Sequence, residues 1–504
     1  MKRLLVVIFS LTLNLASLVV AAERPRNIIF ILVDDQRHDA MSCAGHPFLK
    51  TPALDSLAAG GVRFANAFVT TALCSPSRAS ILTGLYAHSH RVVDNQSGMP
   101  DKLVFFSEHL QRAGYQTAFI GKWHMGHESD EPRRGWNHWV SFTGQGNYLP
   151  ELPSGRKAML NVNGERVPQT GYITDELTDH ALRWLRERPR GTDAKPWMLY
   201  LSHKAAHGDF IPAPRHKGRY AQAEVKPFPT TQGTPLDELR PMWARNQRNS
   251  WHGVEHAYHG RLGKIEDNYR LYCETLLAVD DSTQRLLDWL RETNQLDSTL
   301  VIYMGDNGHL WGEHGLIDKR TAYEASIRVP LLMHCPHQFP KGRVVTEMAA
   351  NIDIAPTILD AAGVKSPEPI HGRSLLPLAR GERVANWRQE LLYEYFWERW
   401  VPSTPTLHAL ITPRWKFVRA YGLWNVHELY DLQTDPHELH NLYTDPAHRD
   451  RTLAMDKRLF ELLAATGGDS IPLHRGWSGS AKEERSPNGS SWTPFPESLQ
   501  RPKP

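Results

Sequence analysis

The chain has 504 residues, with 58 Lys and Arg against 55 Asp and Glu, so its net charge is only +3 when the 26 His are neutral. This length predicts two domains, and the near balance of charge excludes a general nucleic-acid-binding protein, which needs a concentrated basic surface. The four Cys are too few for a disulfide-stapled scaffold, and at most one bridge among Cys43, Cys273 and Cys335 is expected if Cys74 has another role.

The first 22 residues have the pattern of a secretory signal peptide. Met1-Lys2-Arg3 precedes an apolar run from Leu4 to Val20, and two small residues, Ala21 and Ala22, follow it. An uncleaved membrane anchor is the alternative, and no later stretch approaches the length of a membrane span. We therefore expect an exported protein, periplasmic or secreted, with no transmembrane segment after signal cleavage.

Four apolar, β-rich runs predict the strands of a buried sheet. They cover residues 27–33, 115–121, 197–202 and 299–305. Strands that are apolar throughout are typical of a parallel sheet covered by helices on both faces. Helical patterns lie between these runs, at residues 107–114, 174–188 and 269–293. The alternation of strand and helix predicts an α/β domain.

Each of the four runs is followed by polar residues that can bind a metal or an anion. They are Asp34, Asp35, Lys122, His124, Lys204, His207, Asp306 and Asn307. Ligands of open α/β sheets bind outside the carboxyl ends of the strands. One such pair of residues would be an ordinary loop feature, whereas four at the same edge of one sheet predict a functional site.

The character of the sequence changes after about residue 366. Short β-rich runs separated by Pro and Gly turns cover residues 391–398, 408–412, 415–420 and 428–432, and a helical pattern follows at 451–466. This pattern predicts a small antiparallel sheet with a helix. We expect a catalytic domain at 23–370, a small α+β subdomain at 371–470, and an extended or disordered tail at 471–504 that is rich in Pro, Ser, Gly and charge.

The predicted site combines a metal with an anion. Asp34, Asp35, Asp306 and Asn307 offer only oxygen ligands, which suit Ca²⁺ or Mg²⁺ better than zinc; a helix cap would explain only one of the two adjacent aspartates. A cluster of cations beside such a metal indicates a strongly anionic ligand, sulfate or phosphate. The cationic candidates are Arg78, Lys122, His124, His207, Lys319 and His309. Taken singly, each of them is better explained as a solvated charge or a core histidine.

The segment from Thr71 to Gly84 predicts a short helix with Cys74 at its start. Pro76 suits the first position of a helix, and Gly84 suits the residue just past its end. Unpaired N–H groups and the dipole make a helix N-terminus attractive to anions. A phosphatase of similar layout would carry Ser or Thr as its nucleophile here. An exposed reactive thiol in an exported protein would instead be prone to oxidation.

The run Cys74-Ser75-Pro76-Ser77-Arg78, continuing to Leu82-Thr83-Gly84, resembles the signature of type I sulfatases. Blocks at residues 114–126, 202–213, 305–324 and 428–442 resemble blocks of that family in the same order. The resemblance implies an alkaline-phosphatase-like fold, with a large mixed or parallel sheet between helices and a small C-terminal antiparallel sheet. It also implies a Ca²⁺ cofactor, with Mg²⁺ as the alternative, and conversion of Cys74 to formylglycine (3-oxoalanine) by a formylglycine-generating or anaerobic sulfatase-maturating enzyme.

The resemblance also assigns a role to each site residue. The metal ligands would be Asp34, Asp35, Asp306, Asn307 and residue 74. Arg78 would anchor the formylglycine, and Lys122 and Lys319 would bind sulfate oxygens. His124 would be the base that collapses the hemiacetal, and His207, with Lys319, would protonate the leaving alcohol.

In the implied reaction, one hydroxyl of the hydrated aldehyde attacks sulfur and the other later expels sulfate. The block around His207 departs from the family pattern. It reads Ala206-His207-Gly208-Asp209, where Pro-His-x-Pro is commoner.

Two further resemblances bear on the substrate. Residues 78–96 resemble the corresponding stretch of N-acetylglucosamine-6-sulfatases, including the turn that contains Asn95, and residues 140–148 and 161–179 resemble bacterial relatives that act on sulfated glycans. They imply a carbohydrate exo-sulfatase that takes a 6-O-sulfate from N-acetylglucosamine, with Asn95 and His309 as candidate substrate contacts. Four C-terminal side chains could stack on sugar rings or pack in the core. They are Trp397, Trp400, His408 and Trp424.

Other functions remain open at this point. The substrate could be another sulfated glycan, or an aryl or choline sulfate. A phosphatase or phosphodiesterase of the same superfamily is disfavoured by Cys at position 74. A non-catalytic glycan-binding relative is disfavoured because the charged set is intact.

Overall fold

The computed structural model describes residues 27–126, 129–189, 194–248, 250, 252–254, 263–399, 401–422 and 426–472. The expected signal peptide, Trp400, Trp424 and tail residues 473–504 lie outside these ranges. Within them, no helix combines the length and the apolar character needed to cross a membrane.

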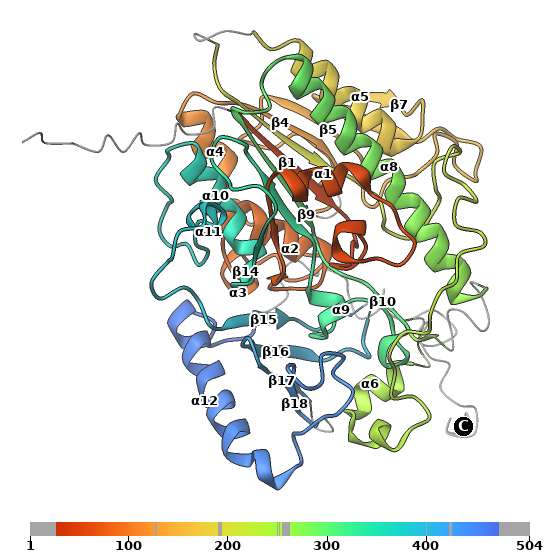
Figure 1. Ribbon diagram of the computed structural model, residues 1–504, viewed down its shortest axis with the longest axis vertical. Helices are drawn as coiled ribbons and strands as arrows, with labels where there is room; N and C mark the ends of the chain where they lie inside the picture. The colour runs from red at the N-terminus through yellow and green to blue at the C-terminus, as the bar shows by residue number, and fades with distance from the viewer. Residues whose placement is uncertain are drawn as a thin grey trace, which may run out of the picture.

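A ten-stranded mixed sheet forms the centre of the larger part of the molecule (Figure 1), with strand order β13-β2-β12-β9-β1-β8-β4-β5-β6-β7. The four apolar runs are its central strands, β1 (Asn27–Val33), β4 (Gln116–Gly121), β8 (Trp197–Ser202) and β9 (Thr299–Gly305). β1 pairs in parallel with both β8 and β9, and β4 pairs in parallel with β8. The predicted strands and their parallel arrangement are confirmed.

Shorter strands extend this sheet and form two small ribbons. β5 continues the parallel pairing beside β4, whereas β12 runs antiparallel to β9, which makes the sheet mixed. The sheet strands are β2 (Val62–Phe64), β5 (His138–Ser141), β6 (Met159–Val162), β7 (Glu165–Pro168), β12 (Leu331–His334) and β13 (Arg343–Val345). The ribbons pair β3 (Ala67–Phe68) with β14 (Ala349–Ala350) and β10 (Leu310–Trp311) with β11 (Ile317–Asp318).

Helices cover both faces of the sheet (Figure 1). One face packs on α1 (Pro52–Gly60), α5 (Ile173–Arg186) and α8 (Ile265–Glu292), and the other on α2 (Cys74–Thr83), α4 (Phe106–Arg112) and α10 (Ile354–Ala361). Alternate residues of β1 enter the two cores, since successive side chains of a strand point to opposite faces. The described short helices are α3 (Ala87–His90), α6 (Met242–Gln247), α9 (Glu324–Ile327) and α11 (Leu376–Arg380).

The predicted C-terminal sheet is also confirmed. It has four antiparallel strands, β15 (Leu391–Tyr395), β16 (Thr406–Ile411), β17 (Trp415–Tyr421) and β18 (Glu428–Asp431), and α12 (Arg449–Thr466) packs across it (Figure 1). The buried Lys416 of β17 ties this sheet to the larger part of the molecule, since its Nζ donates to Ala322 O at 2.9 Å and to Glu324 at 2.8 Å. A buried ion pair of this kind is costly to break.

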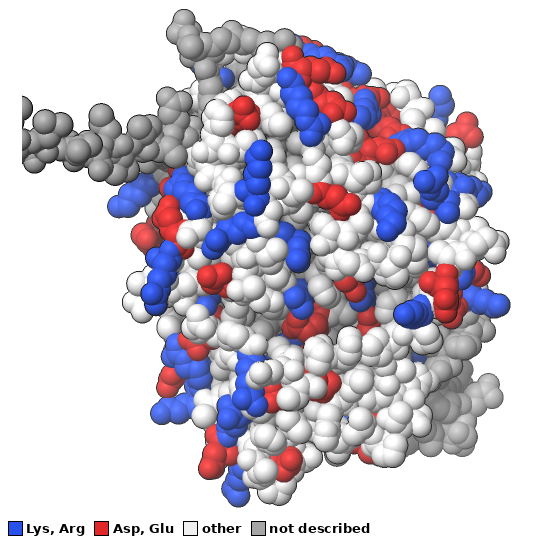
Figure 2. Space-filling view, viewed as in Figure 1, with Lys and Arg blue, Asp and Glu red and all other residues white. Residues whose placement is uncertain are grey.

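The surface shows no concentration of one charge on the face in Figure 2. Lys and Arg are interspersed there with Asp and Glu. This distribution agrees with the near-zero net charge. All four cysteines are free, so none of them forms a disulfide.

Candidate active site

The carboxyl edge of the central strands brings the predicted metal ligands together. Asp34 and Asp35 follow β1, and Asp306 and Asn307 follow the neighbouring β9. The Asp35 backbone N–H donates to Asp306 Oδ1 at 3.1 Å, and the Asp306 N–H donates to Val33 O at 2.9 Å. All four side chains are buried. The edge therefore concentrates carboxylate and amide oxygens in a site with little access to water.

Helix α2 presents Cys74 at this edge. The helix begins at Cys74 itself, after Leu73 in an extended conformation, so Pro76 is its third residue and not its first, as the sequence pattern suggested. The third position tolerates Pro because the first N–H groups of a helix have no partner within it. Asn95 lies at this N-terminus, where its Oδ1 accepts from the Ser75 N–H at 3.1 Å.

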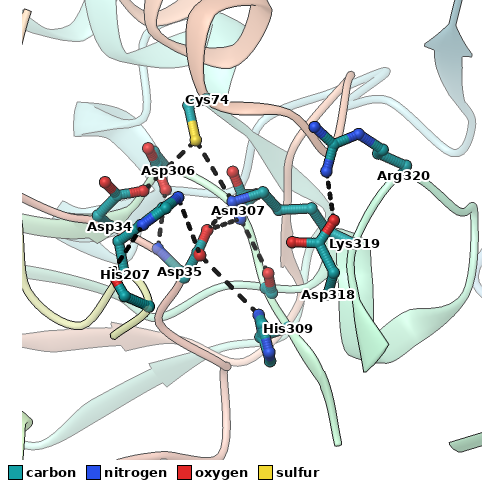
Figure 3. Close-up of polar contacts among 12 residues, drawn as sticks. Asp34, Asp35, Cys74, His207, Asp306, Asn307, His309, Asp318, Lys319 and Arg320 are labelled. Atoms are coloured by element: carbon teal, nitrogen blue, oxygen red, sulfur yellow. Dashed lines mark hydrogen bonds and ion pairs between the residues drawn. The ribbon is translucent and has the colours of Figure 1, made fainter. Parts of the chain in front are cut away.

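The Cys74 thiol is surrounded by charged groups (Figure 3). Its Sγ lies 3.5 Å from Asp34 Oδ1, 3.3 Å from Lys319 Nζ and 3.8 Å from Lys122 Nζ. Burial and the negative charge of Asp34 raise the pKa of the thiol to about 12. Since the thiolate is the reactive form of cysteine, an unmodified Cys74 is a poor nucleophile at neutral pH.

Arg78 lies one turn further along α2 and links three strand ends. Its guanidinium contacts Asp306 at 2.8 Å after β9, Lys122 O at 2.6 Å after β4, and Ser202 Oγ at 2.7 Å at the end of β8. The side chain is almost fully buried. Ser202 was not predicted, and its only sequence signal is a hydroxyl at the end of an apolar run. These contacts hold α2 against the carboxyl edge of the sheet.

The two predicted lysines contact the acidic residues directly. Lys122 Nζ forms an ion pair with Asp34, and Lys319 Nζ forms one with Asp35. Gln145, which the sequence did not single out, accepts from Lys122 Nζ at 2.5 Å, and its Nε2 lies 3.1 Å from His124 Nε2. Lys122 and His124 are thereby joined through one amide side chain.

Burial and charge shift the carboxyl groups in opposite directions. Burial disfavours ionisation of Asp34, but the positive charges of Lys122 and Arg78 outweigh it and hold its pKa well below the usual value. Burial and the negative charge of Asp34 raise the pKa of Asp306 to about 7. The neighbouring cations alone therefore do not stabilise full ionisation of this acidic group, and a further cation would.

The donor set fits a hard divalent cation. Asp34, Asp35 and Cys74 are close enough together to share one ion. Asn307 donates its Nδ2 to Asp35 Oδ1 at 2.6 Å, and its buried Oδ1 has no hydrogen-bond partner among the described residues. Carbonyl and carboxylate oxygens are the ligands that Ca²⁺ and Mg²⁺ prefer. The orphaned Asn307 oxygen supplies the acceptor that a cation at this position requires.

His207 and His309 lie on either side of Asp35 in the close-up (Figure 3). His207 Nε2 is 4.0 Å and His309 Nδ1 is 3.9 Å from Asp35 Oδ2. Burial and Lys122 lower the pKa of His207 well below its usual value, so its imidazole is neutral at neutral pH in the free protein. A bound anion would act in the opposite direction and favour its protonation.

A second charged group borders the site next to Lys319 (Figure 3). Asp318 forms an ion pair with Arg320, and Arg320 Nε donates to Glu398 Oε1 at 2.7 Å. Asp318, Arg320 and Glu398 were not predicted from the sequence. The charged run around Lys319 was a signal for the first two, but Glu398 comes from the C-terminal sheet and has no sequence signal that places it here.

Of the four aromatic candidates in the C-terminal part, two are described. His408 is buried and its Nδ1 lies 2.8 Å from the Tyr421 hydroxyl, so it packs in the core. Trp397 is 51% exposed. Its surface position leaves it available to a ligand.

A mixed sheet between helices, with acidic oxygens, cations and a helix N-terminus at its carboxyl edge, defines a hydrolase of the alkaline-phosphatase type. The family model described as Sulfatase matches residues 26–364, and the model described as N-sulphoglucosamine sulphohydrolase, C-terminal, matches residues 312–465. The chain therefore belongs to the sulfatase family and is an enzyme that hydrolyses sulfate esters. The resemblance seen in the sequence is confirmed.

Several relatives match most of the chain. An N-acetylglucosamine-6-O-sulfatase of Bacteroides thetaiotaomicron is 32% identical over 472 residues, 82% of each chain, and a human N-acetylglucosamine-6-sulfatase is 30% identical, covering 78% of this chain and 71% of that protein. Among solved structures, BT4656 in complex with its substrate D-glucosamine-2-N,6-O-disulfate has a TM-score of 0.78 at 30% identity, and the match covers 89% of this chain and 99% of BT4656.

Proposed function

We propose that this enzyme removes a 6-O-sulfate from a glucosamine or N-acetylglucosamine unit of a sulfated carbohydrate, outside the cytoplasm. The observation that carries the proposal is the position of Cys74, at the N-terminus of α2 and within 3.8 Å of two lysines. The substrate is inferred from the relatives named for this activity.

Residue 74 and the acidic group are proposed to act together. We infer that Cys74 is converted to formylglycine by a maturating enzyme and that Asp34, Asp35, Asp306, Asn307 and residue 74 hold Ca²⁺, with Mg²⁺ as the alternative. Once present, the hydrated aldehyde and the cation supply an activated hydroxyl nucleophile and a second hydroxyl for release of the product.

The lysines are placed to recognise sulfate. Lys122 and Lys319 balance the charge of Asp34 and Asp35 in this structure. Both ammonium groups become available to sulfate oxygens when a cation balances these carboxylates instead, and preorganised donors of this kind stabilise charge that develops in the transition state. Arg78 fixes the position of helix α2, and with it residue 74, through its contacts with Asp306 and Lys122 O.

Two histidines are placed to move protons. His124, bridged to Lys122 by Gln145, is proposed to accept the proton of the second hydroxyl at residue 74. His207 is proposed to protonate the leaving sugar oxygen, since an anionic ester beside it favours its protonated form. Asn95 and His309 remain candidate substrate contacts.

A comparison of esters tests the proposed reaction. We expect 4-nitrophenyl sulfate to be hydrolysed with a kcat/KM at least about 100-fold higher than that of 4-nitrophenyl phosphate, because the site is built for a singly charged ester and a regenerating nucleophile. N-acetylglucosamine-6-sulfate should release sulfate, measured by ion chromatography. Faster turnover of the phosphate would overturn the proposal. That alternative has support, since a relative 30% identical is named a multifunctional alkaline phosphatase superfamily protein, from Trinickia caryophylli.

The role of His207 is tested through the leaving group. In His207→Gln, kcat/KM for N-acetylglucosamine-6-sulfate should fall about 10²- to 10⁴-fold, but that for 4-nitrophenyl sulfate less than about tenfold, because a nitrophenolate leaves without a proton. His337→Gln, at an exposed position, is the matched control. Equal losses on both esters would show that His207 does not act on the leaving group.

A further inference from the structure

A cavity of about 560 Å³ is lined by Lys204 and Asp209, which flank His207 in the chain. It lies between the loop at 146–153 and the segment 204–211 that follows β8. The Tyr148 hydroxyl in its wall donates to His207 O at 2.7 Å. Its volume is in the range of small-molecule binding sites, and the Tyr148 contact places one wall of the cavity against the backbone of the proposed proton donor.

The cavity has mostly apolar walls and one buried cation. Lys204 lines it and is only 3% exposed. Its Nζ donates to Gly208 O at 3.2 Å and lies 4.5 Å from the centre of the Tyr148 ring. Burial is the main cause that lowers the pKa of Lys204 to about 8.

Lys204 has spare hydrogen-bonding capacity and no close counter-ion. An ammonium group has three donors, and only the one to Gly208 O is used within the described residues. Its Nζ forms no ion pair within 4.0 Å with a carboxylate of those residues, and the more distant Asp34, Asp209 and Asp35 offset only part of the effect of burial on its pKa. Keeping a lysine charged in a largely apolar place is costly without a partner. A bound anion would offset this cost.

Both walls of the cavity adjoin the reacting groups along the chain. Gln145, which bridges Lys122 and His124, directly precedes the 146–153 loop. Lys204 is three residues from His207, and His207 lies on the side of the acidic group away from Asp318 and Arg320 (Figure 3). A sugar whose 6-O-sulfate reaches residue 74 would extend past His207 toward Lys204.

We propose that Lys204 binds a second anionic group of the substrate, a sulfate or a carboxylate, in this cavity. The inference rests on the proposed function and narrows its substrate class to glycans that carry a second negative charge close to the 6-O-sulfate. That charge belongs either to an N-sulfate on the same glucosamine or to a uronic acid next to it. Asp209 and Glu151, which are exposed in the same cavity, accept hydrogen bonds from sugar hydroxyls.

The test compares kcat/KM for three substrates. They are N-acetylglucosamine-6-sulfate, glucosamine-2-N,6-O-disulfate, and a disaccharide of a uronic acid with N-acetylglucosamine-6-sulfate. We expect the wild type to prefer at least one doubly charged substrate by about tenfold or more, as hydrogen bonds to charged groups allow. Lys204→Met should lower this preference about tenfold, Lys204→Arg should retain most of it, and Asp209→Asn should raise it by removing a repulsive charge. Lys217→Met, an exposed lysine outside the cavity, is the control.

The three substrates distinguish the possible positions of the second anionic group. Preference for the disulfate places the second anion on the same sugar, and preference for the disaccharide places it on the neighbour. No preference in the wild type, or an equal loss on all substrates in Lys204→Met, overturns the inference.

A binding measurement makes the test independent of turnover. In a Cys74→Ala background, calorimetry should show weaker binding of the preferred doubly charged ligand when Lys204 is Met. Absence of sulfate release from every substrate, with this Lys204-dependent binding intact, would count against the proposed reaction and not against the anion site. Binding that does not depend on Lys204 would overturn the site itself.

Discussion

Replacing Cys74 by Ala should lower sulfate release by at least about 10³-fold, because removing a covalent nucleophile removes the step on which the other groups act. The melting temperature should stay within a few degrees of the wild type, since the substitution removes only the small functional group at the end of one buried side chain. Initial rates with 4-nitrophenyl sulfate and thermal unfolding measure the two effects. Full activity in the Ala variant would show that residue 74 is not the nucleophile.

Cys74→Ser provides the matched comparison. Serine offers one hydroxyl and no second one, so it should release the alcohol once per enzyme molecule and then retain the sulfate ester. Mass spectrometry of the peptide spanning residues 71–91 should show the wild type lighter by about 18 Da than the unmodified sequence, as expected for conversion of a thiol to an aldehyde. A protein that is fully active with an intact thiol would contradict the formylglycine assignment.

Removing divalent cations should lower the rate of sulfate release at least about 10²-fold. A metal at this position would stabilise the charge that develops in the transition state by several kcal/mol. The melting temperature reports metal binding without requiring catalytic turnover. Ca²⁺ at about 100 times its Kd should stabilise the folded protein by about 2.7 kcal/mol. The physical reason is that burial and the neighbouring Asp34 raise the pKa of Asp306, and a cation bound among these carboxylates would favour its ionised form.

Asp35→Asn is the control for this experiment. It removes one carboxylate from the acidic group but keeps its size, so both the gain in melting temperature and the restoration of activity by Ca²⁺ should be weaker. Titration with Mg²⁺ in parallel distinguishes the two candidate ions. Unchanged activity after chelation, together with no thermal shift on adding either ion, would exclude a functional metal at this edge of the sheet.

Much of the fold could be predicted because its signals are local. β1, β4, β8 and β9 are apolar along their whole length, a pattern that only a buried strand explains at this length. Residues that directly follow these strands could be brought together by one rule, that the carboxyl ends of parallel strands share an edge. Asp34, Asp306 and Lys122 come together for this reason.

Other parts of the site could not be predicted because their position depends on tertiary contacts. Gln145 lies in a loop after β5 and no periodicity marks it, yet it bridges Lys122 and His124. Glu398 follows a strand of the other sheet, about 80 residues beyond its partner Arg320. The same limit applies to His408, whose burial depends on packing between β16 and β17 and not on its own sequence.

The contacts of the small sheet have a consequence for how such enzymes diverge. Glu398 anchors Arg320, and Lys416 anchors Glu324, and both anchored residues belong to the short segment that directly follows Lys319. The position of the segment next to Lys319 thus depends on side chains from both structural units. If the small C-terminal sheet were replaced by that of a relative, we expect the preference among sulfate esters to change partly toward that of the relative. The residues proposed to carry out the reaction would all remain those of this chain.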